Sequence, residues 1–194
     1  LKDPVCTPPT AKSDLVYTGT AQALINKGSA TGGTMQYSLT SGSGYSTDIP
    51  METDAGDYTV YYKVVGASGY SDVAEKSITV HINKATPSGE PIYAKITAAK
   101  KTLADAALKP NASWPAGTVK WELENTTEVK ADTAYKWIFT PKDSANYETL
   151  TGTVVLYTKS TPVTPSQPGG GGGGSSSDRD SYDSNPVIKT ETKN

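Results

Sequence analysis

The segment DAGDYTVYY, residues 54–62, joins a short acidic turn to a strongly alternating run. Large side chains recur there at every second position, at Tyr58, Val60 and Tyr62. A period of two is typical of a β-strand and places these three side chains on one face. The small and acidic residues before Tyr58 are typical of a tight turn. The segment therefore predicts a strand that begins at a corner and buries one face.

The same pattern occurs twice in the chain. Residues 33–39 (GTMQYSL) match residues 117–123 (GTVKWEL), and each match is Gly-Thr followed by alternation. Residues 58–70 (YTVYYKVVGASGY) match residues 135–147 (YKWIFTPKDSANY), and both begin and end on Tyr. The first match assigns three pairs of side chains to the buried face: Met35 with Val119, Tyr37 with Trp121, and Leu39 with Leu123. Matched strands and turns in the same order indicate a duplicated domain.

Short β-rich runs broken by Gly, Pro and Asn fill both copies, and this spacing is typical of a sandwich or a barrel. We therefore expect an all-β chain with one domain over residues 8–84 and a second over residues 85–158. Residues 96–110 (ITAAKKTLADAALKP) leave two alternatives open. Ala, Lys and Leu favour a short helix that Pro110 would end, whereas a strand followed by a turn also fits.

Aromatic residues in both copies stand at positions that are typical of immunoglobulin-like (Ig-like) sandwiches. Tyr58 and Tyr135 take the place of the tyrosine corner, whose hydroxyl bonds to the backbone a few residues upstream. Val60 and Trp137 take the place of the second disulfide cysteine, and Trp121 that of the buried tryptophan on the preceding strand. We therefore predict two tandem Ig-like β-sandwich domains without a disulfide, in which these four aromatic residues are structural.

The two copies resemble the small Ig-like repeats of bacterial cell-surface and adhesion proteins. LVYTGTAQALI (15–25), GGTMQYSL and AGDYTVYYKVVGASGY are similar to one kind of module found there. KTLADAAL, AGTVKWEL and YKWIFTPKDSANYETLTGTVVLY are similar to a second kind that often follows it. The resemblance covers residues 8–158. It implies a non-catalytic spacer or stalk of an extracellular, cell-surface protein, whose other domains would bind cell-wall or host glycans or proteins.

Residues 159–194 differ from the rest of the chain, because Gly, Ser and Pro dominate and few side chains are apolar. Such a segment cannot offset the entropy cost of ordering, so we predict a disordered linker or tail. Its six consecutive glycines lack the strand, the helix and the Gly-Lys-Ser/Thr ending of a phosphate loop. Asp178, Asp180 and Asp183 lack the central Gly and terminal Glu of a calcium loop.

Composition argues against several classes of function. The net charge is −2, which offers no electrostatic basis for binding nucleic acid. The sequence contains no run of 18 apolar residues that would predict membrane insertion. Cys6 and His81 are the only residues of their types, and the alternation around His81 points it outward. They cannot supply a catalytic triad or a zinc site, so we expect no enzymatic activity, no cofactor and no metal.

A second hypothesis is a glycan- or protein-binding module that uses exposed aromatic rings. Its candidate ligand contacts are Tyr45, which we expect to face solvent, and Trp114, which lies in a predicted loop before Pro115. A third hypothesis, a self-cross-linked pilin-like domain, rests on ETDAGDY (52–58). That segment lacks the Pro of the pilin-type motif and the Gly that precedes its Tyr.

Overall fold

The structure is a computed structural model, and it describes residues 1–159. The first ten strands are β1 (Val5–Thr7), β2 (Thr10–Ala11), β3 (Leu15–Val16), β4 (Gln22–Ala23), β5 (Ile25–Asn26), β6 (Ser29–Thr31), β7 (Gly33–Ser38), β8 (Met51–Glu52), β9 (Gly56–Gly66) and β10 (Val73–Asn83). The 3-10 turn η1 (Leu103–Ala106) follows, and then β11 (Gly117–Trp121), β12 (Ala134–Pro141) and β13 (Leu150–Val155). The all-β prediction is confirmed for this part of the chain. Within it, no helix is long and apolar enough to cross a membrane.

The predicted disordered tail, residues 159–194, lies outside the described residues apart from Lys159.

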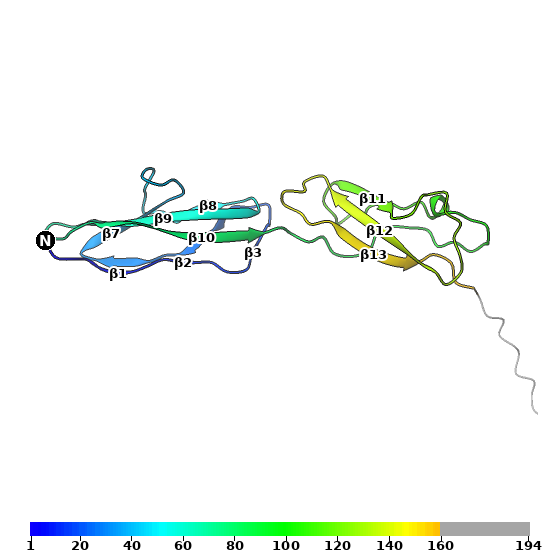
Figure 1. Ribbon diagram of the computed structural model, residues 1–194, viewed down its shortest axis with the longest axis horizontal. Coiled ribbons are helices and arrows are strands. Elements are labelled where there is room, and N and C mark those ends of the chain that lie inside the picture. Colours follow the sequence, from blue (N-terminus) through cyan, green and yellow to red (C-terminus); the bar gives the residue numbers. More distant parts are fainter. Residues whose placement is uncertain (160–194) are drawn as a thin grey trace, which may run out of the picture. The chain divides into compact units, whose positions relative to one another are not determined.

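The main sheet of the first part of the chain has the order β3-β10-β9-β7, and the long hairpin β9–β10 forms its centre (Figure 1). β9 is antiparallel to both of its neighbours, whereas β3 runs parallel to β10. Three short antiparallel pairs, β1–β6, β2–β5 and β4–β8, accompany this sheet. We refer to β1–β10 as the first strand group.

The first strand group encloses a core that follows the alternation of the sequence. In β9, Val60 and Val64 are 0% and 2% exposed. The residues of this first core are Leu24, Ile25, Met35, Tyr37, Val60, Val64, Val80 and Ile82. Period-two burial on three neighbouring strands explains why this segment folds as a sheet rather than as a helix.

The second part of the chain forms an antiparallel sheet in which β12 lies between β11 and β13 (Figure 1). Across β11 and β12, Val119 pairs with Phe139 and Trp121 pairs with Trp137. We refer to η1 and β11–β13 as the second strand group. Its core comprises Ile96, Leu103, Ala106, Trp114, Trp121, Val129, Tyr135, Trp137, Phe139, Val154 and Leu156. Aromatic rings thus fill much of this second core, which contains all three tryptophans of the chain.

The segment 96–110 contains neither a full helix nor a strand. Its one regular element is η1, where the Thr102 backbone N donates to Oδ2 of Asp105 at 2.7 Å. The turn ends at Ala107, whose φ of 47° lies in the left-handed region. Leu103 and Ile96 are buried in the second core. Packing of these two side chains therefore holds a segment whose composition by itself favours helix.

Two leucines that the alternation assigns to the buried face are exposed instead. Leu39 is 39% exposed and Leu123 is 52% exposed. β7 ends at Ser38 and β11 ends at Trp121, so both leucines lie beyond the end of a strand. Alternation between faces holds only while the backbone stays extended, and this part of the prediction was therefore wrong.

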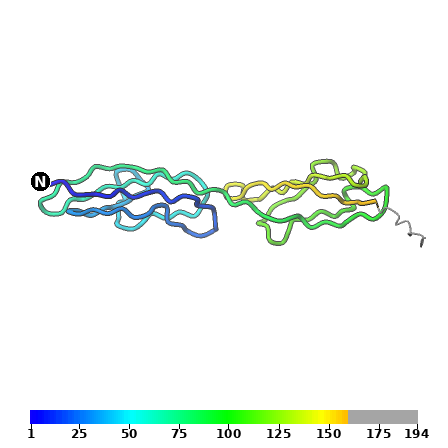
Figure 2. The backbone as a smooth tube through the Cα atoms, turned by 90° about the horizontal axis from the view of Figure 1, so that it is seen from below, coloured from blue at the N-terminus to red at the C-terminus, as the bar shows by residue number. Residues whose placement is uncertain are grey.

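The two cores have no residue in common. β10 ends at Asn83, and the first buried residue of the second core is Ile96. Figure 2 traces the backbone from the first strand group through this stretch into the second. Contacts nevertheless join the two groups, including a parallel bridge between Ala85 and Tyr147, and Leu1–Lys159 form one compact unit.

Candidate functional site

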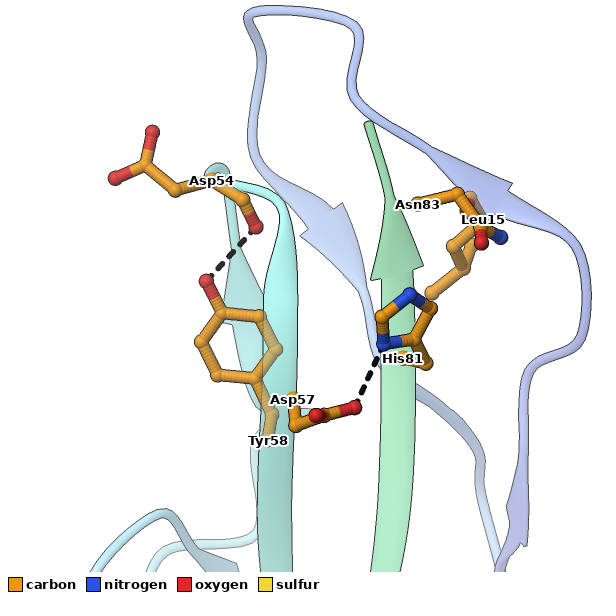
Figure 3. Close-up of polar contacts among 6 residues, drawn as sticks. All are labelled: Leu15, Asp54, Asp57, Tyr58, His81 and Asn83. Atoms are coloured by element: carbon orange, nitrogen blue, oxygen red, sulfur yellow. Dashed lines mark hydrogen bonds and ion pairs between the residues drawn. The ribbon is translucent and has the colours of Figure 1, made fainter. Parts of the chain in front are cut away.

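The corner before β9 has the local geometry that its sequence suggests. The Tyr58 hydroxyl donates to the backbone O of Asp54 at 2.8 Å (Figure 3). The ring of Tyr58 packs against the first core and is half-buried. Desolvation, followed by the nearby carboxylates of Glu52 and Asp54, raises the pKa of this hydroxyl above its ordinary value. Tyr58 therefore anchors the corner and stays protonated at neutral pH.

The equivalent tyrosine of the second copy is more deeply buried. Tyr135 is 5% exposed. Its hydroxyl accepts a hydrogen bond from Lys130 N at 2.8 Å and donates to Glu128 O at 3.4 Å. Because the hydroxyl both accepts and donates, it satisfies two main-chain groups of the preceding loop. Tyr135 thus connects this loop to the central strand of the second sheet.

The two tryptophans assigned to structural positions both lie in the second core. Trp121 is 4% exposed, and its Nε1 donates to Leu103 O at 3.2 Å, which connects β11 to η1. Trp137 is 3% exposed, and its Nε1 is the one buried side-chain polar atom of residues 1–159 without a partner. A Cβ added to Gly152 would lie 2.5 Å from the Trp137 ring, so only glycine fits beside it. The ring therefore lies in tight contact with the backbone of β13.

Tyr45 lies in the long loop between β7 and β8, which projects from the sheet in Figure 1. The carboxylate of Glu75 accepts hydrogen bonds from the hydroxyls of Tyr45 and Ser41 and from the backbone N of Gly42. The Lys63 ammonium lies 4.3 Å from the centroid of the Tyr45 ring. Tyr45 is therefore half-buried and engaged on both its hydroxyl and one ring face, rather than freely exposed to solvent.

These contacts shift the protonation equilibria of both partners. Desolvation and the hydrogen bond to Glu75 raise the pKa of Tyr45 to about 12. Hydrogen bonds from Tyr45, Ser41 and Gly42 hold the pKa of Glu75 below its ordinary value. At neutral pH the loop is accordingly held by a carboxylate that accepts from two hydroxyls and one amide. Glu75 is exposed and has no motif around it, so the sequence offered no signal for this role.

Trp114, the other candidate ligand contact, does not face solvent. It is 8% exposed, and its ring centroid lies 4.5 Å from that of Phe139 and 5.5 Å from that of Trp137. Its Nε1 donates to Ser88 O at 2.8 Å. A turn closed by Trp114 N and Asn111 O directs the side chain back onto the core. The interpretation of Trp114 as an exposed stacking residue is therefore corrected, because a residue in a loop can still be buried.

His81 lies on the outward face of β10, as the alternation predicts. Its Nδ1 lies 2.6 Å from Oδ1 of Asp57, and both side chains are more than half exposed (Figure 3). Cys6 is a free, half-buried thiol in β1, near the start of the chain. Among residues 1–159, no group of three or more His, Cys, Asp or Glu side chains gathers where it could hold a metal ion.

A cleft of 490 Å³ is lined by the start of β9, the end of β10, the link that follows β10, and Glu148 from the turn between β12 and β13. Its polar lining comes from His81, Asn83, Lys84, Thr86 and Glu148. Lys84 Nζ donates to Ser144 O at 2.7 Å, outside the lining. The lining contains no serine or cysteine.

Asn146, like Ser38, is a buried polar residue that sequence reasoning did not identify. It is 7% exposed and contacts Asp54 and Ala55 of the first strand group as well as Asp143 of its own turn. In the sequence it looks like an ordinary turn residue in DSANY, and only the folded chain brings Asp54 to it.

Comparison with protein-family models, with curated proteins and with solved structures found no match to this chain.

Proposed function

We propose that the protein is a non-catalytic structural spacer or stalk module of an extracellular, cell-surface or adhesion protein. In this proposal residues 8–84 and 85–158 are two tandem Ig-like β-sandwiches. The observation that carries it is where the aromatic rings lie. Trp114, Trp121 and Trp137 are all buried in the second core, and Tyr45 is engaged by Glu75 and Lys63. Rings that a binding module would expose are thus used to hold the folds together.

The polar groups support the same proposal. The hydroxyls of Tyr58 and Tyr135 bond to nearby main chain, where they stabilise corners and loops. The pair of His81 and Asp57 is exposed, and no other side chain of residues 1–159 bonds to it and orients it for proton transfer. A spacer needs packed folds and a short connection between them, and the two separate cores and the segment after Asn83 support the proposal.

A single-molecule pulling experiment tests the spacer proposal directly. Two independent sandwiches should unfold in two separate events, each of which lengthens the chain by on the order of 250 Å. A single event that releases both strand groups together would contradict the tandem-domain organisation.

A binding experiment tests the competing function, a glycan- or protein-binding module. Because Trp114 is buried, this alternative depends on Tyr45 and its loop. On a glycan array and in calorimetry we expect no binding tighter than about millimolar, which corresponds to roughly 4 kcal/mol. Micromolar binding that Tyr45→Ala abolishes, and that the exposed loop variant Ser43→Ala retains, would replace the spacer proposal with the binding module.

A further inference from the structure

The two strand groups meet at a junction formed by three segments. These are the corner Asp54–Ala55 before β9, the link Lys84–Ala85 after β10, and the turn Asp143–Tyr147 between β12 and β13. Asn146 lies at the centre of the junction and is 7% exposed. A buried carboxamide requires hydrogen-bond partners for both its oxygen and its amino group, so its contacts show what the junction depends on.

The Asn146 side chain bonds to both strand groups at once. Its Oδ1 accepts from Ala55 N at 2.8 Å. Its Nδ2 donates to Oδ1 of Asp54 at 3.1 Å and to Oδ2 of Asp143 at 3.1 Å. Both amide protons are therefore used, one toward each group. The bonds to the carboxylates are charge-assisted, which is the stronger kind of hydrogen bond.

The backbone and two other side chains reinforce this contact. Ala85 N donates to Asn146 O, and Glu148 N donates to Ala85 O, each at 2.9 Å. The rings of Tyr17 and Tyr147 meet edge to face with centroids 5.3 Å apart. An isolated parallel bridge between Ala85 and Tyr147 thus joins the link to the turn that contains Asn146.

We propose that Asn146 acts as a latch that holds the two strand groups in one fixed mutual orientation. The covalent link alone leaves several soft backbone dihedrals free to rotate. Any rotation that separates Asp54 and Ala55 from Asn146 breaks two bonds and leaves buried polar groups to be solvated again. The inference rests on the division into two domains in the proposed function, and it adds that the connection between them is stiff.

Distance measurement between two spin labels tests the latch in the full 194-residue chain. The substitutions Thr79→Cys on β10 and Thr118→Cys on β11 place one cysteine at an exposed position of each strand group, and a spin label is attached to each. Cys6→Ser removes the native free cysteine, so that it takes up no label. With Asn146 present we expect one narrow distance distribution. Asn146→Ala should broaden it, with an increase of about tenfold or more in the population outside the original peak.

Two further variants make the outcome decisive. Asn125→Ala removes an exposed amide of the second strand group away from the junction, and it should leave the distribution unchanged. Asp54→Ala removes only the partner in the first strand group, so it should broaden the distribution while the turn around Asn146 stays intact. Tryptophan fluorescence should match that of the unsubstituted chain in all three variants, which shows that the second core stays folded.

Two results would overturn the latch: a distribution that is already broad with Asn146 in place, or one that neither Asn146→Ala nor Asp54→Ala changes. Micromolar glycan binding would instead contradict the spacer function and leave the latch standing.

Discussion

Replacing Trp114 with alanine should destabilise the second core by about 3–5 kcal/mol, the range typical of a large buried aromatic. The side chain is 8% exposed, so nearly all of its surface is removed from water. An aromatic ring of this kind buries roughly 150–250 Å², and at about 25 cal/mol per Å² the transfer contribution is about 4–6 kcal/mol. That value is an upper bound because the unfolded chain already buries part of the ring.

Urea unfolding followed by tryptophan fluorescence measures this change. All three tryptophans lie in the second core, so their emission reports on that core alone, and two of them remain in the variant. With a urea dependence of about 1–3 kcal/mol per M, the midpoint should fall by roughly 1 M or more. Trp114→Phe is the matched control. It keeps a ring against Phe139 but loses the bond to Ser88 O, and it should cost less, about 1–2 kcal/mol.

The result that would refute this reasoning is an unchanged unfolding midpoint for Trp114→Ala. The ring would then be exposed in solution, and the glycan-binding hypothesis would regain its best candidate residue. A loss of stability as large in Trp114→Phe as in Trp114→Ala would show that the indole hydrogen bond, rather than the packing of the ring, stabilises the core.

Other consequences can be measured on the same chain. Gly152→Ala should destabilise the second core by about 1–3 kcal/mol, because the added Cβ overlaps the Trp137 ring; equal stability in urea would show that the ring can move aside. Tyr135→Phe should cost about 1 kcal/mol, since the part-buried hydrogen bond from Lys130 N loses its acceptor, and thermal unfolding that matches the parent chain would contradict the contact. In the folded chain the pKa of Tyr45 is raised to about 12. The stability that its protonated hydroxyl contributes is therefore complete below the unfolded pKa of about 10, and it is lost as the pH rises through 12. In an ultraviolet titration Glu75→Gln should move this ionisation back toward 10, and a titration identical in both proteins would argue against the hydrogen bond. If the two cores unfold independently, circular dichroism should show two transitions and tryptophan fluorescence one, whereas coincident single transitions would indicate one cooperative unit.

Much of the strand pattern could be predicted because burial along a strand has a local cause. Val60 on β9 and Val80 on β10 each belong to a run in which large side chains occupy every second position. The pleat of an extended strand by itself places such side chains on one face. The hydroxyl of Tyr58 finds its partner only four residues away, so its corner is also encoded locally. The same rule failed at Leu39, where the strand had already ended and the pleat no longer set the direction of the side chain.

The sequence by itself therefore determined the all-β character of residues 1–159, the longer strands β7 and β9–β13, and the position of the corner before β9. Only the tertiary structure decided the roles of Trp114 and Asn146. Trp114 lies in a turn without periodicity, and its burial depends on Phe139, which is distant in sequence. Asn146 bonds to Asp54, which precedes it by 92 residues. Whether a loop side chain meets solvent, a core or another segment depends on which distant part of the chain packs against it, and no local pattern records that.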